Sequence, residues 1–337
     1  MPVAIVTGSN TGIGFHTALS LCRKGYTVIV ACRNQERGTT AAIEINNILK
    51  NETSRLESGE AIFMQIDTSS LASVRTFASV FKSNYTELHA LVLSAGMNSV
   101  GMKKEDLTTK DGYSVTFESN YLGHFYLTQL LLPILKQTAA STIPRQGPPI
   151  RIVTLSSVTH RLVSSVPDWT KAILRESKKS YQVSKFAMAQ FAFELQRRFH
   201  SEGIGDRIQA ITVNPGGVYS DIWRTFPSYV LFFLKPIMSL FFLNTKQGSA
   251  TSVAAASDYE FTGGKSILAG EFLYLTPYRI PRWTGEGTLL ALLFDSLGPF
   301  GGALPALPTP LTKDSKSAKD LWEASETAIN KVLGQQA

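Results

Sequence analysis

The chain has 337 residues, of which 44% are hydrophobic and 18% charged. This composition supplies enough apolar material for one large core and excludes an intrinsically disordered chain. Thirty-three Lys and Arg against 26 Asp and Glu give a net charge of +7, which could attract nucleic acid, anionic lipid or a phosphate-bearing cofactor. Because the basic residues are scattered and form no stripe with interleaved aromatic side chains, we expect a solvated basic surface and no nucleic-acid partner.

Short apolar, β-branched runs alternate with longer helical patterns along the first two thirds of the chain. The predicted strands are residues 3–6, 28–31, 62–65, 90–94, 150–155 and 208–213, and the predicted helices are residues 14–24, 34–50, 70–83, 114–136 and 180–200. Strands that alternate with helices indicate a parallel sheet. Their near-continuous hydrophobicity indicates strands that helices cover on both faces, in a doubly wound α/β arrangement.

The two cysteines, Cys22 and Cys32, fall within the first predicted strand–helix–strand unit. Their number and position predict neither a disulfide framework nor a metal site. The first strand begins at Val3, which leaves no room for a secretory signal peptide. We therefore expect a cytoplasmic protein that is not secreted.

The last third of the chain has a different pattern. Residues 226–243 are very apolar, and residues 298–310 are rich in Gly and Pro. Residues 315–333 predict a closing helix with one apolar face, formed by Leu321, Trp322, Ile329 and Leu333. We expect a single domain over residues 1–300, followed by the Gly/Pro-rich segment and C-terminal helix of residues 301–337.

A glycine-rich loop follows the first strand directly. It reads Thr7-Gly-Ser-Asn-Thr-Gly-Ile-Gly14 and leads into a predicted helix. Glycines allow a tight turn, close approach of the backbone to a pyrophosphate, and close packing of helix on strand, while the helix N-terminus supplies free N–H groups. Such a loop alone is a weak signal of nucleotide binding, but its place between the first strand and the first helix makes it a strong one.

Two side chains after the second and third strands bear on the nucleotide. Arg33 stands where an acidic residue would bind the ribose hydroxyl of NAD, and a guanidinium there would pair with the 2′-phosphate of NADP(H). The alternative is an exposed arginine at a strand end. Asp67 could accept a hydrogen bond from the adenine amino group, and it could equally cap the next helix.

Polar residues that could carry chemistry occur in three later places. Tyr181 and Lys185 are four residues apart and lie on one face of a predicted helix. Ser156 and Ser157 follow the strand at 150–155, at the edge where open α/β sheets bind their ligands. Asn120, within a predicted helix, could either bond back to its own helix or hold a water.

In their order and spacing these residues resemble the classical short-chain dehydrogenase/reductase family, over about residues 3–275. The motifs are the loop of residues 7–14, Asp67, Ala95-Gly96, Asn120, Ser157, Tyr181-x-x-x-Lys185 and Pro215-Gly216. The stretches Asn120-Tyr-Leu-Gly-His-Phe125 and Ser156-Ser-Val-Thr-His160 are similar to the retinol dehydrogenase-like branch. The resemblance implies a single-domain Rossmann-type sheet of about seven strands.

The resemblance also implies roles for individual residues. Tyr181 would be the general acid or base, Lys185 would favour its phenolate and hold the nicotinamide ribose, Ser157 would orient the substrate oxygen, and Asn120 would hold a water. The cofactor would be NADP(H). The implied cofactor-binding residues are Gly8, Ser9, Asn10, Gly12, Ile13, Gly14, Arg33, Asp67, Ala95, Gly96, Tyr181, Lys185, Pro215, Gly216, Val218 and Ser220.

Three features depart from the family pattern. Ser94 stands where the family has an asparagine that helps to fix the central strand, and Ser220 stands where a threonine is usual. We also expect the protein to lack the N-terminal membrane anchor that is common among retinol dehydrogenases. Ser94 weakens a structural expectation and not the chemistry, whereas the expected lack of an anchor bears on location and substrate.

The apolar residues 223–243 lie where the family covers its substrate pocket, and they favour a small lipophilic carbonyl or alcohol as substrate. The same residues could instead complete the core, or touch a membrane peripherally, at the endoplasmic reticulum or a lipid droplet. A retinoid is the first expectation for the substrate, and a steroid or other lipid carbonyl is the alternative. A homodimer is compatible with the resemblance, and a non-catalytic NADP(H)-binding protein is the rival function.

Overall fold

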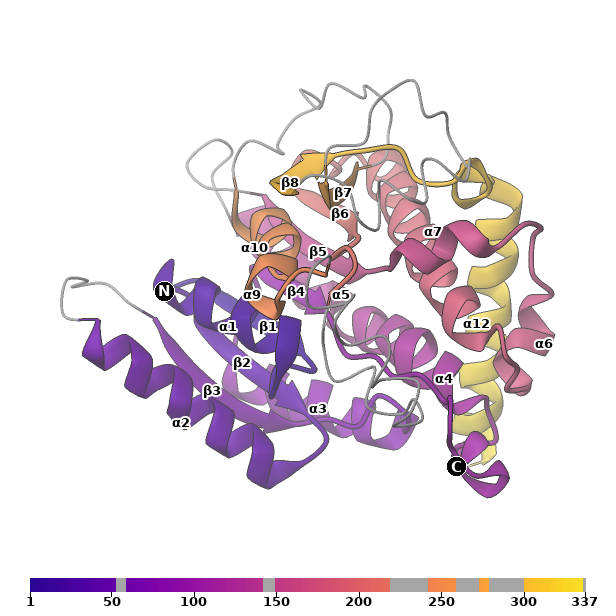
Figure 1. Cartoon of the computed structure of the whole chain (residues 1–337), viewed down its shortest axis with the longest axis horizontal. Helices are drawn as coiled ribbons and strands as arrows, with labels where there is room; N and C mark the ends of the chain where they lie inside the picture. The colour runs from indigo at the N-terminus through magenta and orange to yellow at the C-terminus, as the bar shows by residue number, and fades with distance from the viewer. Residues whose placement is uncertain (53–58, 142–148, 219–241, 259–272, 279–299, 336–337) are drawn as a thin grey trace.

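The computed structural model describes residues 1–52, 59–141, 149–218, 242–258, 273–278 and 300–335, and these contain a single eight-stranded sheet (Figure 1). The order of its strands is β3-β2-β1-β4-β5-β6-β7-β8. The strands are β1 (Val3–Thr7), β2 (Thr27–Cys32), β3 (Glu60–Gln65), β4 (Ala90–Leu93), β5 (Ile150–Leu155), β6 (Ile208–Val213), β7 (Leu273–Tyr278) and β8 (Phe300–Pro305). All neighbours pair in parallel except β7 and β8, which are antiparallel.

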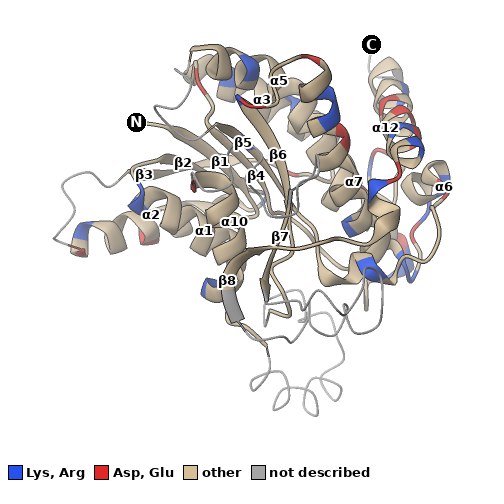
Figure 2. Cartoon of the chain, turned by 90° about the horizontal axis from the view of Figure 1, so that it is seen from above, with Lys and Arg blue, Asp and Glu red and all other residues tan. Residues whose placement is uncertain are grey.

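Helices cover both faces of the sheet (Figures 1 and 2). One apolar core lies between the sheet and the helices α1 (Gly12–Arg23), α2 (Gln35–Asn51) and α10 (Ala250–Ser257). The other core lies under α3 (Leu71–Asn84), α5 (Gly123–Ser141), α7 (Ser180–Ser201) and α12 (Ser315–Gln335). Shorter elements are η1 (Lys104–Leu107), α4 (Val115–Phe117), η3 (Val158–Leu162), α6 (Trp169–Leu174), α9 (Thr245–Gly248) and η7 (Pro310–Lys313). The predicted doubly wound α/β sheet is confirmed.

The central strands are buried along their whole length. Every residue of β1, β2, β4 and β5 is buried, which is the pattern of strands that helices cover on both sides. The edge strand β3 exposes both of its end residues. The continuous apolar runs of the sequence therefore correspond to the strands at the middle of the sheet.

The predicted helix over residues 114–136 is found, but it is interrupted near its start. The chain forms the short α4, then a π-helical turn over Glu118–Leu122, and only then α5, which continues to Ser141. A π-turn inserts one residue into a helix, and such turns often occur at functional sites. The whole turn is buried, so no alternation of exposed and buried positions could have revealed the insertion in the sequence.

The strand β8 lies within the Gly/Pro-rich segment, where the sequence predicts no strand. It pairs Thr276 with Leu304 and ends at Pro305, while Gly302 takes a φ of +84°. Glycine and proline weaken strands and are tolerated mainly at edges and irregularities. Because β8 pairs through backbone hydrogen bonds at the sheet edge, its composition could not reveal it.

The predicted C-terminal helix is confirmed as α12, and it packs on α6 and α7. The indole of Trp322 lies 5.0 Å from the Phe125 ring and 6.0 Å from the Phe191 ring, and the Arg198 guanidinium stacks 3.7 Å above the indole. The Ser325 and Tyr121 hydroxyls hydrogen-bond at 2.9 Å. One face of α12 therefore completes the core over α5 and α7.

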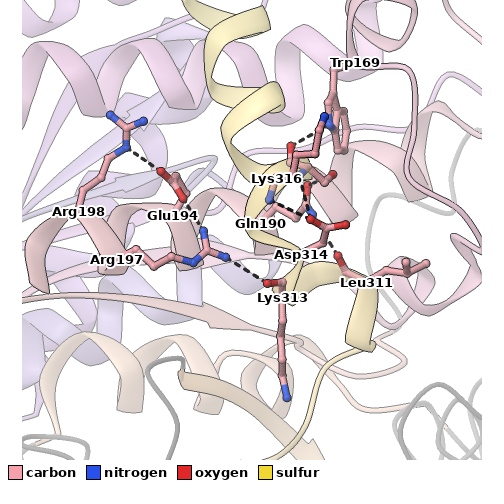
Figure 3. A network of polar contacts seen from close by, with 10 residues as sticks. Trp169, Gln190, Glu194, Arg197, Arg198, Leu311, Lys313, Asp314 and Lys316 are labelled. Carbon is pink, nitrogen blue, oxygen red and sulfur yellow. Dashed lines mark hydrogen bonds and ion pairs between the residues drawn. The ribbon is translucent and has the colours of Figure 1, made fainter. Parts of the chain in front are cut away.

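Polar contacts from α7 hold the segment that leads into α12 (Figure 3). The Gln190 amide donates to the Leu311 carbonyl at 3.1 Å and accepts from the Ser317 hydroxyl at 3.0 Å. Arg197 pairs with Glu194 and also donates to the Lys313 carbonyl at 3.3 Å. These bonds fasten the main chain before α12 to side chains of α7.

Within the described residues, no helix is both long enough and apolar enough to span a membrane. The same residues contain no group of three or more His, Cys, Asp or Glu side chains that could hold a metal ion.

We expect Trp322→Ala to lower the free energy of unfolding by about 3–5 kcal/mol, because it empties a buried site between two aromatic rings. Urea denaturation followed by circular dichroism measures this change. Lys319→Ala is the matched control, since Lys319 is exposed on the same helix and its loss should change stability by less than about 0.5 kcal/mol. A similar, small effect of both variants would contradict the packing described for α12.

Candidate active site

Polar side chains gather at the carboxyl edge of the sheet, where β1, β4 and β5 end. Ser156 and Ser157 follow β5, Ala95 and Gly96 lie just after β4, and the glycine-rich loop follows β1. The helix α7 brings Tyr181 and Lys185 to the same edge. This edge is where open α/β sheets bind their ligands.

Ser157 and Tyr181 lie next to each other. A hydrogen bond with the Ser157 side chain lowers the pKa of the Tyr181 hydroxyl, but burial has the larger effect and raises this pKa to about 12. The phenol is therefore protonated at neutral pH in the structure as it stands. It could donate a proton to a substrate oxygen, and it needs a nearby positive charge to lose one.

Lys185 is almost fully buried, with 5% of its surface exposed. Its ammonium group donates to the Leu155 carbonyl at 2.9 Å and lies 5.8 Å from the centroid of the Tyr181 ring. Burial lowers the pKa of Lys185 from 10.5 to about 8. At neutral pH the residue is still a cation, and it is the positive charge that the adjacent phenol needs.

The two serines after β5 have different surroundings. The Ser156 hydroxyl is buried and donates to the main-chain carbonyl of Lys185 at 2.8 Å, so it ties α7 to the end of β5. The Ser157 side chain is half-buried, accepts from the Thr159 N–H at 3.3 Å and faces Tyr181. Of the two, Ser157 is therefore placed to meet a substrate oxygen.

Asn120 is the middle residue of the π-turn, and its side chain does not bond back to its own helix. Its amide oxygen accepts from the Met97 N–H at 2.7 Å, and its amide nitrogen donates to the Met97 carbonyl at 3.0 Å and to the Ser184 hydroxyl at 2.9 Å. The predicted alternative of a local back-bond is wrong. The side chain instead links the segment after β4 to α7.

Gly96 shows how closely these groups approach one another. A Cβ atom on Gly96 would lie 3.2 Å from the Lys185 ammonium nitrogen and 3.4 Å from the Asn120 amide oxygen. Larger side chains at this position would need one of these groups to move. Three of the predicted site residues therefore meet at one point.

The glycine-rich loop has the shape that a dinucleotide phosphate requires. A Cβ on Gly8 would come within 2.7 Å of the Ala95 backbone, and one on Gly14 within 2.5 Å of the Gly8 carbonyl oxygen. Gly12, with φ of +62°, starts α1 and has only the Thr245 methyl within 4 Å of an added Cβ. Two glycines thus pack the loop tightly while the third leaves open space at a helix N-terminus, so the chain fits a pyrophosphate there.

The other predicted residues of the loop differ in exposure. Asn10 is half-buried, and Ser9 is buried with its hydroxyl donating to the Val6 carbonyl at 2.6 Å. Contact between Ser9 and a phosphate would therefore come from its main chain. Ile13 packs against Val218, so the loop and the segment after β6 lie side by side.

The segment after β6 turns sharply at the predicted Pro215-Gly216. Gly216 has φ of +83° and donates its N–H to the Asn214 side chain at 3.0 Å. Only glycine adopts this conformation without strain. Ser220 and nearly all of the predicted lid of residues 223–243 lie outside the described residues, which resume at Phe242.

Arg33 and Asp67 lie at the carboxyl ends of β2 and β3. The Arg33 side chain is exposed and, among the described residues, forms no ion pair. Asp67 accepts from the Ser69 N–H at 3.0 Å and from the Ser69 hydroxyl at 2.6 Å, while Ser70 caps the following helix. The helix-capping alternative for Asp67 is therefore wrong.

Two polar residues of this edge were not among the predicted site residues. Thr7 places its hydroxyl where it accepts from the N–H groups of Ser94 and Ala95, at 2.8 and 2.9 Å, and so joins β1 to β4. Ser184 accepts from Asn120 and donates to the Tyr181 carbonyl at 2.7 Å. The only sequence signal was that Thr7 opens the glycine-rich motif and that Ser184 lies within Tyr181-x-x-x-Lys185.

The chain is similar to known proteins over most of its length. The model of the short chain dehydrogenase family matches residues 2–229. Mouse retinol dehydrogenase 12 is 37% identical over 267 residues, which cover 78% of this chain and 76% of that protein. Human polyprenol dehydrogenase is 34% identical over 273 residues, which cover 81% of this chain and 76% of that protein.

A solved structure shares the fold. The crystal structure of an uncharacterised protein from Mycobacterium paratuberculosis superposes with a TM-score of 0.64 at 25% sequence identity, and the match covers 98% of this chain and 94% of the other. The similarity therefore extends over nearly the whole chain, beyond the residues that the family model matches.

We expect Lys185→Met to stabilise the protein at pH 7. Burial lowers the pKa of Lys185 in the folded protein from 10.5 to about 8, which corresponds to a cost of about 3 kcal/mol whenever the group is charged in both the folded and the unfolded state. Between pH 8 and 10.5 the unfolded chain binds this proton more tightly than the folded one, so wild-type stability from this group rises with pH. The stability advantage of the variant should shrink over that range.

Urea denaturation of wild type and variant at pH 7, 8, 9 and 10 measures the difference. Lys319→Met, on the exposed face of α12, is the control and should show no such trend. A Lys185→Met variant that is less stable than wild type at pH 7 would mean that the ammonium group is well solvated or paired.

Proposed function

Because the chain belongs to the short-chain dehydrogenase family, we propose that it is an NADP(H)-dependent oxidoreductase that interconverts a carbonyl and an alcohol on a lipophilic substrate. The observation that carries the proposal is the meeting of Ser157, Tyr181 and Lys185 beside the glycine-rich loop. Asn120 approaches the same point through its contact with Gly96. A protein that only bound the nucleotide would not need all four side chains there.

The residues have separate tasks in carbonyl reduction. The Ser157 hydroxyl donates to the substrate oxygen and orients it, and the Tyr181 hydroxyl gives that oxygen its proton. The Lys185 ammonium stabilises the phenolate that remains. Bound NADPH would supply the hydride, held by the glycine-rich loop and by Lys185. In alcohol oxidation each proton moves in the opposite sense.

Burial keeps the Tyr181 phenol in its protonated form at neutral pH. Its pKa of about 12 and the Lys185 pKa of about 8 mean that, at neutral pH, tyrosine is protonated and lysine is charged. This is the protonation state that reduction requires. NADPH is generally kept reduced in cells, so we place the physiological direction from carbonyl to alcohol.

A lipophilic substrate is supported by two observations. The relatives named above act, by their names, on retinol and polyprenol, and residues 223–243 are rich in Phe and Leu. A retinoid carbonyl such as all-trans-retinal is the first substrate to test. Cytoplasmic location with membrane association remains part of the same proposal.

We expect Tyr181→Phe to lower kcat by at least about 1000-fold, because it removes the proton donor, and to leave NADPH binding nearly unchanged. Oxidation of NADPH with all-trans-retinal, followed by absorbance, measures turnover, and quenching of intrinsic fluorescence measures NADPH binding. Ser157→Ala should also lower kcat, by about 100-fold. Near-normal turnover of Tyr181→Phe would refute the catalytic assignment.

We expect Arg33→Asp to reduce the preference for NADPH over NADH by about tenfold to a hundredfold. The change removes a charge-assisted contact, which contributes about 1.5–3 kcal/mol, and adds a carboxylate that repels the 2′-phosphate. The ratio of kcat/KM for the two cofactors, compared between wild type and variant, measures the effect. Arg37→Asp is the control, because Arg37 is also exposed and lies four residues further along, on α2. A wild type without NADPH preference would overturn the cofactor proposal.

A further inference from the structure

His124 lies one turn beyond Asn120, at the start of α5, and it is completely buried. Both of its ring nitrogens have partners. Nδ1 lies 2.9 Å from the Asn120 main-chain oxygen, and Nε2 lies 2.9 Å from the Thr7 hydroxyl. Burial lowers the pKa of His124 to about 4, so the ring is neutral and carries one N–H and one lone pair at neutral pH.

The partners of the ring determine which nitrogen carries the proton. A carbonyl oxygen can only accept, so Nδ1 must donate to Asn120 and Nε2 must accept. The hydrogen bonds of the Thr7 hydroxyl independently indicate that Nε2 accepts. Its hydroxyl oxygen already accepts two N–H groups, from Ser94 and Ala95, which uses both lone pairs and leaves its proton for Nε2. The Val92 carbonyl, at 3.4 Å, is the more distant alternative.

The result is one directed chain of hydrogen bonds. It runs from the N–H groups after β4 through the Thr7 hydroxyl and the His124 ring to the carbonyl of Asn120. It connects residues that are 117 positions apart in the sequence. The Thr7–His124 and His124–Asn120 bonds are buried, and the bonds from Ser94 and Ala95 are partly buried, so little water is available to replace a bond that is lost.

We infer that His124 is a positioning residue, which fixes the main chain of Asn120 in the π-turn relative to the end of β4 and the glycine-rich loop. The inference rests on the proposed function. Asn120 holds Met97 and Ser184 through its side chain, so its placement also determines the distance between Gly96 and α7. His124 therefore acts on the reaction without touching the substrate.

Three substitutions separate the two bonds of the ring. His124→Phe keeps an aromatic ring at this position and removes both hydrogen bonds. His124→Asn keeps a donor near the place of Nδ1, and His124→Gln places an amide near Nε2. We expect His124→Phe to lower kcat about 100-fold, as a small misplacement of a site residue can, and to change the KM for NADPH by less than about threefold. His124→Asn should recover more of kcat than His124→Gln.

Thr128→Val is the matched control. The Thr128 hydroxyl is buried one turn further along α5 and donates to the His124 main-chain carbonyl at 2.8 Å, so the variant also loses a buried hydrogen bond in the same helix. We expect it to lose melting temperature as His124→Phe does, with kcat unchanged. Equal kcat in His124→Phe and wild type, or kcat that follows melting temperature across all variants, would overturn the inference.

Two further measurements test the inference if His124→Phe does not fold or if wild type turns over no carbonyl. If His124→Phe does not fold, the comparison of His124→Asn with His124→Gln stands in its place, and a better rescue by Gln overturns the inference. The ¹⁵N chemical shifts of the histidine ring in wild type without ligand report the tautomer. A neutral ring protonated on Nδ1 supports the inference, and protonation on Nε2 overturns it. If wild type turns over no carbonyl but shows the Nδ1 tautomer, the proposed function fails while the hydrogen-bond chain stands.

Discussion

Lys185 carries its charge into the interior of the protein, with its ammonium group 2.9 Å from the Leu155 carbonyl at the end of a central strand. Desolvation of a cation is unfavourable, and a single carbonyl offsets only part of the loss. The group stays there because the surrounding elements are held by a large apolar core that does not depend on it. The apolar core between the sheet and its helices therefore offsets the unfavourable burial of this charge.

The elements around this charge are held by bonds between side chains and main chain. Ser156 fixes the backbone of Lys185, Asn120 fixes that of Met97, and Thr7 fixes the segment after β4. Each tie joins two different elements and is buried or partly buried. Such ties specify positions to within a fraction of an ångström, whereas apolar packing alone allows small displacements. The reacting groups are in this way preorganised before any ligand binds.

Much of the fold could be predicted from the sequence, because its main features are local. Continuous apolar runs mark the buried strands, and residues directly after those runs must lie at the carboxyl edge. This reasoning suffices to place Ser157 and the glycine-rich loop, and the i,i+4 spacing suffices to place Tyr181 beside Lys185.

The features that sequence could not predict depend on distant contacts. The π-turn around Asn120 is buried on every side, so the periodicity of the sequence does not mark its extra residue. The strand β8 is selected by its neighbour β7 and not by its own composition. The Thr7–His124 contact spans 117 positions, and neither residue type alone indicates it.

The C-terminal helix also has a consequence for the order of folding during synthesis. The Tyr121 hydroxyl, next to Asn120, meets Ser325, and the Tyr113 hydroxyl donates to the Ala328 carbonyl at 2.7 Å. Both partners are translated more than 200 residues later. The nascent chain can form its first strands and helices on the ribosome, but it exposes the apolar surface of α5 and α7 until α12 has been translated and can dock on them. Chaperones that bind apolar segments therefore have a defined surface on this protein, and the interval in which they can act ends when α12 docks.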